Sequence, residues 1–269
     1  MIAVVDYQKG NLKSVERGLI AAGGEAFITA DASEIAKADA IVLPGVGAFA
    51  DAAATMCELR QMEVIRERVR AGVPFLGICL GEHLMFEHGV EGAPEGNPAC
   101  GLGLLPGTVV AMPRCDAQGK TFKVPHVGWN TIEMPSCNGG VTVPPCGEGG
   151  GNAVLSSGGA GGGAARSSAA KRGLFEHGAF PGSTPQPGSE LAFACPLFDG
   201  IAPGEYFYFT HSYIAPTGSH TIAETTHSVR FTSAVQFGEC AFGVQFHPEK
   251  SSDAGARVLA NFVAIAARG

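Results

Sequence analysis

Cys79 ends an apolar run that begins at Phe75, and a glycine stands two residues away on either side, at Gly77 and Gly81. This pattern is typical of a nucleophile elbow, in which a buried strand turns sharply into a helix and leaves the side chain at the corner accessible. The N-terminus of the following helix favours negative charge, so it favours a thiolate and leaves backbone N–H groups free to bind an oxyanion. The pattern therefore predicts a cysteine nucleophile at position 79.

A base for this thiol is offered far downstream, where an apolar run from Phe242 leads into His247, Pro248 and Glu249. In an extended chain, residues two apart point to the same side, so we expect the His247 imidazole and the Glu249 carboxylate to project together. The carboxylate would orient the imidazole, and the imidazole would activate the thiol. Cys79, His247 and Glu249 are therefore the predicted catalytic residues.

Each motif alone also has an ordinary structural explanation. A Gly-x-Cys-x-Gly sequence can hold a buried structural cysteine beside a turn, and a His-Pro-Glu sequence can be a simple surface turn. Their joint occurrence at the ends of two apolar runs favours catalysis.

The elements that must position these residues alternate between strands and helices. Residues 2–5 and 40–43 are short apolar β-type runs, each followed by a loop and then by apolar residues at helical spacing. The second helix is expected to carry the apolar residues from Met56 to Val69, and residues 73–78 supply a third strand that ends at the elbow. Such an alternation predicts an α/β fold with a mostly parallel twisted sheet, helices on both faces and the site at the carboxyl ends of the strands.

The second half of the chain differs in composition. Aromatic and β-branched runs at 204–210 and 233–237 predict extra strands there. Residues 132–173 contain no aromatic side chain, and residues 158–165 are all glycine or alanine, so this segment cannot bury enough apolar surface to offset its ordering entropy. We interpret residues 136–190, approximately, as a flexible insertion in a single domain that spans residues 1–269. A phosphate-binding loop is the alternative, but no Gly-Lys-Ser or Gly-Lys-Thr follows the glycines.

Bulk composition excludes several classes of protein. The chain has 269 residues, of which 45% are hydrophobic, yet no apolar stretch is long enough to span a bilayer and the N-terminus lacks a basic leader. We therefore expect a cytoplasmic protein, or one of an organelle stroma, with reduced thiols. The cysteines never fall in Cys-x-x-Cys spacing and the net charge is −7, so neither a metal site, a cofactor nor a nucleic-acid partner is expected.

Further segments of the sequence strengthen the case for an enzyme and point to a family. These are Asp6-Tyr7 with Gly10-Asn11-Leu12, Pro44-Gly45-Val46-Gly47-Ala48-Phe49, Pro125-His126-Val127-Gly128-Trp129-Asn130 and Tyr208-Phe209-Thr210-His211-Ser212-Tyr213. Together with the two catalytic motifs, they resemble the class I, triad-type glutamine amidotransferases with a flavodoxin-like fold. Within that class the chain is most similar to the glutaminase subunits of imidazole glycerol phosphate synthases, over its whole length except the insertion.

The resemblance implies a reaction and a partner. The reaction is hydrolysis of the side-chain amide of L-glutamine through a cysteine thioester, in histidine biosynthesis. The ammonia passes through a tunnel to a (βα)8-barrel cyclase subunit, which forms imidazole glycerol phosphate.

The resemblance also implies roles for residues outside the triad. Backbone N–H groups of Val46 and Leu80 would form the oxyanion hole, and we hypothesise that this hole is incomplete until the partner and its nucleotide bind. The remaining residues fall into two groups. Gly47, His83, Ser212 and Tyr213 would bind glutamine, and Trp129, Asn130, Tyr208 and Lys250 would face the cyclase near the tunnel entrance. For Trp129 and Tyr208 the alternative is an ordinary core position, and for His126 and His211 no catalytic role is expected.

The sequence departs from the family pattern directly after the elbow. The family normally has Met-Gln there, and this glutamine binds the α-groups of the substrate, whereas this chain has Glu82-His83. A histidine could still donate a hydrogen bond, but its geometry and charge differ. Three alternatives therefore stay open: another triad amidotransferase, a hydrolase of γ-glutamyl bonds that works without a partner, and a silent scaffold for the barrel subunit.

Overall fold

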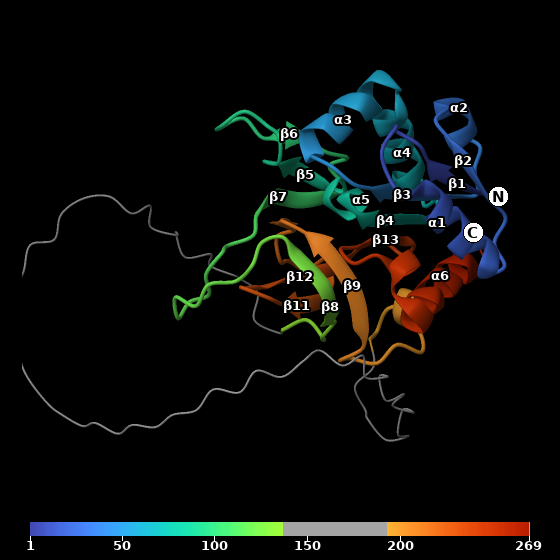
Figure 1. The fold of residues 1–269 in the computed structure, drawn as a ribbon. Coiled ribbons are helices and arrows are strands. Elements are labelled where there is room, and N and C mark those ends of the chain that lie inside the picture. Colours follow the sequence, from blue (N-terminus) through green and yellow to red (C-terminus); the bar gives the residue numbers. More distant parts are fainter. Residues whose placement is uncertain (137–192, 269) are drawn as a thin grey trace, which may run out of the picture. The chain divides into compact units, whose positions relative to one another are not determined.

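A seven-stranded sheet forms the centre of the fold in our computed structural model, which describes residues 1–136 and 193–268. The strand order is β11-β12-β13-β4-β3-β1-β2 (Figure 1). Five strands run parallel: β1 (Ile2–Val5), β2 (Ala26–Thr29), β3 (Ala40–Gly45), β4 (Phe75–Cys79) and β13 (Ala241–Val244). At one edge β11 (Thr221–Thr226) and β12 (Arg230–Phe237) continue the sheet in antiparallel orientation.

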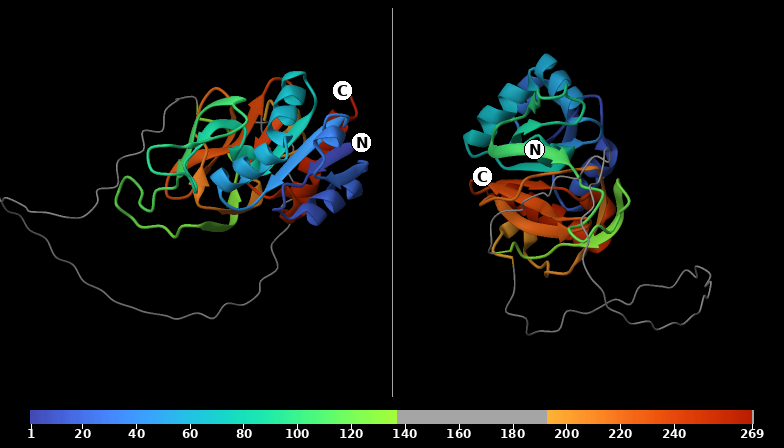
Figure 2. Two further views of the ribbon diagram at one scale, coloured as in Figure 1. Left: turned by 90° about the horizontal axis from the view of Figure 1, so that it is seen from above. Right: turned by 90° about the vertical axis from the view of Figure 1, so that its left-hand side faces the viewer.

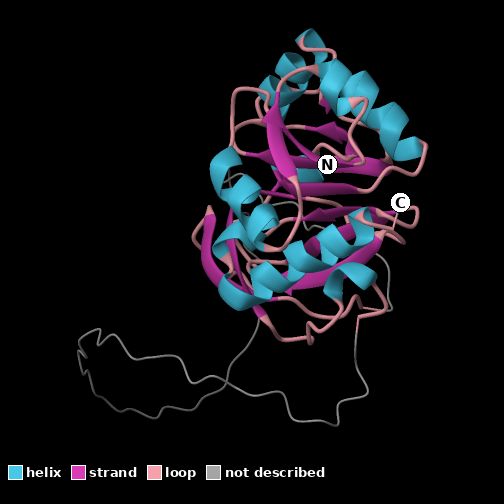
Figure 3. Ribbon diagram, turned by 90° about the vertical axis from the view of Figure 1, so that its right-hand side faces the viewer, coloured by secondary structure: helices cyan, strands magenta, loops and turns pink. Residues whose placement is uncertain are grey.

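Helices cover both faces of this sheet, which explains why its central strands are apolar along their whole length (Figure 3). One face carries α1 (Leu12–Ala21) and α6 (Ser252–Ala266). The other face carries α2 (Ala32–Ile35), α3 (Phe49–Glu58) and α4 (Gln61–Arg70). The two faces hold two separate apolar clusters, because successive side chains of each strand point to opposite sides.

Two smaller sheets flank the central one (Figure 2). The four-stranded sheet contains β5 (Phe86–Gly89), β6 (Ala99–Cys100), β7 (Leu105–Ala111) and β10 (Tyr213–Ile214). The two-stranded sheet pairs β8 (His126–Thr131) with β9 (Tyr206–His211). Three short helices complete the described chain: α5 (Leu80–His83), η1 (Pro196–Phe198) and η2 (Pro248–Lys250).

The predicted fold class is confirmed, including the parallel sheet, the helices on both faces and the extra strands of the second half. One element prediction was wrong. The single helix expected through Met56 and Val69 is two helices, because Arg60 between them adopts a left-handed conformation with φ of 59°. The sequence pattern did not predict β2, a strand of four residues on the sheet edge, three of which are only partly buried.

The described residues belong to one compact unit, formed by Met1–Pro144 and Leu191–Gly269. The insertion predicted at about 136–190 lies, apart from its first residue, outside the described residues, so its place in a single domain stays a prediction. Among the helices of residues 1–136 and 193–268, none is long and apolar enough to cross a membrane.

Candidate active site

Cys79 is the last residue of β4, and it has the strained backbone expected of an elbow, with φ of 54° and ψ of −107°. A non-glycine residue at positive φ costs about 1–3 kcal/mol. The flanking glycines are needed for a different reason, which is close packing. A Cβ atom at Gly81 would lie 1.8 Å from the carbonyl oxygen of Leu43, and one at Gly77 would lie 2.5 Å from the carbonyl oxygen of Gly81. The turn into α5 therefore presses directly against β3 and β4.

His247 and Glu249 form the second half of the site, just beyond the end of β13. His247 Nδ1 lies 2.9 Å from Glu249 Oε1, and both side chains are almost completely buried. The expected extended geometry was wrong, because Pro248–Lys250 forms the 3-10 helix η2. This turn brings the carboxylate back to the ring, so the two side chains meet as predicted by another backbone route. A further contact fixes the backbone here: the Ser251 hydroxyl donates to the His247 carbonyl oxygen at 2.6 Å.

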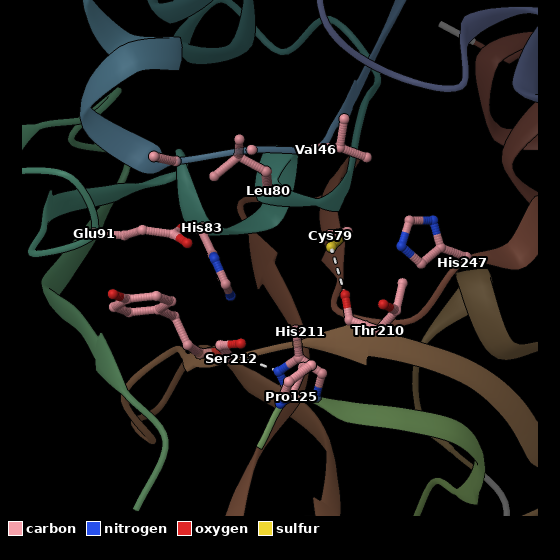
Figure 4. Close-up of a pocket in the computed structure, with 13 residues that line it drawn as sticks. Val46, Cys79, Leu80, His83, Glu91, Pro125, Thr210, His211, Ser212 and His247 are labelled. Atoms are coloured by element: carbon pink, nitrogen blue, oxygen red, sulfur yellow. Dashed lines mark hydrogen bonds between the residues drawn. The ribbon is translucent and has the colours of Figure 1, made fainter. Parts of the chain in front are cut away.

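The bond to Glu249 determines which nitrogen of His247 is free. A carboxylate only accepts, so Nδ1 carries the proton and Nε2 has no hydrogen-bond partner. Burial alone would lower the pKa of His247, but the nearby Cys79 sulfur and the Glu249 carboxylate together raise it to about 9. The Cys79 thiol donates to the Thr210 carbonyl oxygen, 3.9 Å away, and Nε2 of His247 accepts no hydrogen bond (Figure 4). The free imidazole nitrogen and the sulfur are thus neighbours that are not yet hydrogen-bonded.

A cavity of about 390 Å³ opens above these groups, at the carboxyl ends of the parallel strands. Figure 4 shows its wall, with Cys79 and His247 on one side and His83 and Glu91 on the other. The lining residues are Val46, Gly47, Ala48, Cys79, Leu80, His83, Glu91, Pro125, Thr210, His211, Ser212, Tyr213 and His247. The volume is in the range of small-molecule sites, and the thiol is part of the cavity wall.

All residues expected to form the oxyanion hole and to bind substrate line this cavity: Val46, Leu80, Gly47, His83, Ser212 and Tyr213. The two oxyanion-hole residues differ in burial, since the Val46 side chain is exposed on its loop and Leu80 is buried in the first turn of α5. Beneath the loop lies the buried hydroxyl of Tyr7, whose pKa is raised by burial and by Cys79 and lowered by the Val46 N–H. The roles of these residues stay predictions.

His83 occupies the place of the expected glutamine, but its hydrogen bonding differs from the expectation. Burial lowers its pKa to about 4, against the opposing effect of Gln245, so the ring is neutral near pH 7. Its Nε2 lies 2.6 Å from Gln245 Oε1, and because that oxygen only accepts, Nε2 must carry the single proton. The remaining Nδ1 is an acceptor, so His83 has no second donor for a ligand in the cavity.

Six cavity or nucleophile neighbours were not predicted: Ala48, Glu91, Pro125, Thr210, His211 and Gln245. Glu91 follows β5, and burial raises its pKa, opposed by a hydrogen bond from the Phe49 N–H. No local signal marks Glu91, because it reaches the site only through the smaller sheet. Gln245 did carry a signal, since it stands two residues before His247 in a run that was otherwise apolar.

The four residues expected to face a partner lie outside the cavity wall, and three of them form one cluster. Trp129 is 46% exposed, so the alternative of a core position is wrong for it. It pairs across the strands with Tyr208, whose ring also lies 5.9 Å from the Lys250 ammonium group. Asn130 differs from the other three because its amide is engaged with the chain itself, donating to the Thr226 carbonyl oxygen at 2.9 Å.

Comparisons with known proteins agree with this geometry. The family described as glutamine amidotransferase class-I matches residues 3–139. The imidazole glycerol phosphate synthase subunit HisH of Moorella thermoacetica is 36% identical over 263 residues, covering 97% of this chain and 93% of its own length. The HisH subunit of Rhodopirellula baltica is 35% identical and covers 97% of this chain and 96% of its own length.

Solved structures are similar in fold at low sequence identity. A crystal structure of a glutamine amidotransferase matches with a TM-score of 0.58 at 16% identity, covering 99% of this chain and all of the other. The structure of PurLQS from Thermotoga maritima matches with a TM-score of 0.56 at 15% identity, covering 98% of this chain and 97% of the other. The sequence matches decide the family: the chain belongs to the class I glutamine amidotransferases and, within them, to the HisH subunits of imidazole glycerol phosphate synthase.

Proposed function

We propose that this chain is the glutaminase subunit of an imidazole glycerol phosphate synthase and that it supplies ammonia for histidine biosynthesis. It hydrolyses the side-chain amide of L-glutamine and delivers the ammonia to a (βα)8-barrel cyclase subunit. The observation that carries this proposal is the His247 ring, bound through Nδ1 to Glu249 with its free Nε2 beside the Cys79 sulfur. The cytoplasmic location stays a prediction.

The proposed reaction begins with the sulfur. Because the pKa of His247 is raised to about 9, the ring takes the Cys79 proton at Nε2 and leaves a thiolate. The thiolate attacks the side-chain amide carbon, and the resulting oxyanion is bound by the N–H groups of Leu80 and Val46. His247 then gives the proton to the departing nitrogen, which leaves as ammonia and a thioester remains. A water molecule attacks the thioester as His247 takes its proton, and the proton returns to sulfur when glutamate leaves. Glu249 holds the ring orientation through its bond to Nδ1.

Substrate recognition is divided between charged and neutral groups in the cavity wall. Glu91 is the acidic side chain of the wall and is suited to the α-ammonium group of glutamine. The neutral His83 presents an acceptor, Nδ1, and thus also favours an ammonium group over a carboxylate. Backbone groups at Gly47, Ser212 and Tyr213 remain for the α-carboxylate and for orientation.

The partner is expected to dock on the outer face of the β8–β9 sheet, which consists of Val127, Trp129, Tyr206 and Tyr208. Three of these side chains are unusually exposed for apolar or aromatic residues, at 56% for Val127, 46% for Trp129 and 56% for Tyr206. The face begins at the cavity, because Val127 pairs with Thr210, whose carbonyl oxygen lies beside Cys79. A partner bound here would close the side of the cavity through which ammonia leaves.

The test of this proposal is glutamate release by the full chain, measured alone, with the cyclase subunit, and with the cyclase and its nucleotide substrate. Release that rises strongly on adding both components supports the proposal. Equal release in all three mixtures would identify a hydrolase that works alone, and release in none would identify a silent scaffold. Cys79→Ala serves as the inactive control.

A further inference from the structure

A buried side-chain amide connects the cavity wall to the nucleophile. Gln245 follows directly after β13 and is fully buried. Its Nε2 lies 3.6 Å from Cys79 Sγ, and its Oε1 lies 2.6 Å from His83 Nε2. The amide is therefore the middle of a three-residue chain from His83 to the sulfur.

The two ends of the amide are chemically different, so its orientation decides what the sulfur meets. The nitrogen end donates and suits a thiolate, whereas the oxygen end would place lone pairs against it. The structure has the first orientation: the amide nitrogen faces the sulfur, and the amide oxygen accepts the Nε2 proton of His83, so the two contacts favour the same arrangement. We propose that Gln245 is a positioning residue for the nucleophile, which donates to Cys79 Sγ and is held in the donating orientation by His83.

Among the side chains around the sulfur, Gln245 is the one that donates a hydrogen bond to it. The thiol now points at the Thr210 carbonyl oxygen, a contact that suits S–H and that a thiolate cannot make. Other titratable groups approach from several elements, namely Tyr7 after β1, Glu82 and His83 on α5, His211 on β9, Glu91 after β5, and His247 with Glu249 after β13. Glu82 is fully buried without a hydrogen-bond partner, and burial raises its pKa well above the usual value, which favours the neutral form. Its Oε2 is 3.9 Å from His83 Nε2, too far to compete with Gln245.

The consequence is a coupling between the cavity wall and the nucleophile. His83 lines the cavity and reaches the sulfur only through the amide. This inference rests on the proposed role of Cys79 as nucleophile. It also assigns a function to His83, which stands where the family normally has glutamine: like that glutamine, the imidazole can donate a hydrogen bond to the Gln245 amide oxygen and so orient the amide.

The experiment measures the rate of Cys79 alkylation by iodoacetamide as a function of pH, on the full chain. The sequence contains seven other cysteines, so the modified Cys79 peptide is followed by mass spectrometry. We expect Gln245→Met to slow alkylation near pH 7 by about tenfold or more and to move the midpoint of the profile to higher pH, as for loss of a hydrogen bond to a charged group. His83→Leu should act in the same direction, the double variant should add no further loss, and His83→Gln should behave like the wild type.

Gln236→Met is the matched control, because Gln236 lies on β12 outside the cavity wall and its amide donates to the Gly238 carbonyl oxygen just after the strand. An unchanged Cys79 profile in folded Gln245→Met would overturn the proposal, and additive losses in the double variant would overturn the coupling to His83. If Gln245→Met does not fold, Gln245→Glu replaces it, because glutamate keeps the shape of the side chain and lacks the N–H donor. A wild-type alkylation profile in this variant would also overturn the proposal. Glutamate release is assayed in parallel, so a chain that shows the expected profiles but no glutaminase activity would refute the proposed function alone.

Discussion

The two nitrogens of His247 have different surroundings. Nδ1 is bound to Glu249, and Nε2 has no hydrogen-bond partner. In the proposed reaction Nε2 would exchange a proton with the sulfur, the leaving nitrogen and water. A substitution of Glu249 that keeps the shape of the side chain and removes its charge tests this difference directly.

Glu249→Gln keeps the volume of the side chain and removes the carboxylate that stabilises the imidazolium. We expect the pKa of His247 to fall below about 9, since the carboxylate is one of the groups that raise it. The kcat/KM for glutamine in the complex with the cyclase should fall by a factor of about 10³ or more. NMR titration of the imidazole and steady-state kinetics measure the two effects. A variant with normal kinetics would show that the acid does not orient the base.

His83 gives the protein a dependence of stability on pH that is unusual for a single side chain. Its pKa is lowered by burial to about 4 in the folded chain, from 6.5. The unfolded chain therefore binds more protons between these values, and the stabilisation is complete above pH 6.5 and lost as the pH falls toward 4. Between pH 7 and pH 5 the loss from this group is about 2 kcal/mol.

The variant His83→Gln removes the titrating imidazole, and with it this pH dependence, and keeps a hydrogen-bond donor for Gln245. We expect its free energy of unfolding in urea to decrease by about 2 kcal/mol less than that of the wild type between pH 7 and pH 5. Identical slopes for the two proteins would mean that His83 is protonated in the folded state, contrary to the neutral ring on which the orientation of Gln245 depends.

At the scale of elements, the elbow depends on how closely α5 approaches β3. The position of Gly81 leaves no space for a side chain, because the obstacle is the backbone carbonyl of Leu43 and not a movable side chain. The helix is only one turn long, so stabilisation of an oxyanion there would come from the nearby N–H groups more than from a helix dipole.

Gly81→Ala should destabilise the fold by about 3 kcal/mol or more, because the backbone of α5 or β3 must move. Gly96→Ala is the control: a Cβ atom there meets open space, and only its left-handed φ of 72° opposes the change, at about 1–2 kcal/mol. Urea unfolding compares the two variants with the wild type. An equal loss in both variants would mean that the elbow can relax around a methyl group.

At the scale of the whole molecule, the cavity and the exposed β8–β9 face lie next to one another. The register of the two strands places Thr210 at the cavity and Tyr208 two residues further out on the same face. A partner on this face would therefore both bind the aromatic cluster and cover the mouth of the site.

Trp129→Ala should weaken binding of the cyclase subunit by about 10- to 100-fold, as for a central aromatic residue of an interface. The stability of the free chain should change little, because the ring is nearly half exposed. Ile20→Ala is the control, since Ile20 is 53% exposed on α1, outside this face. Calorimetric titration measures the affinity, and an equal affinity of both variants would place the interface elsewhere.

The sequence predicts some of the strands and helices, but not all of them. The strands β1, β3 and β4 follow from apolar runs, because strands buried on both faces require them. The break between α3 and α4 at Arg60 does not follow from the sequence. The two helices share one apolar spacing, and only the backbone conformation of Arg60 separates them.

The sequence by itself determined the family, the fold class and the identity of the sulfur, imidazole and carboxylate groups, since each of these stands in a local motif with its own spacing. Tertiary structure decided which further groups meet them. Glu91 reaches the cavity through a separate sheet, and Gln245 meets His83 across 162 positions of the chain. Such contacts depend on the packing of one element on another, and no local pattern of residues records that packing.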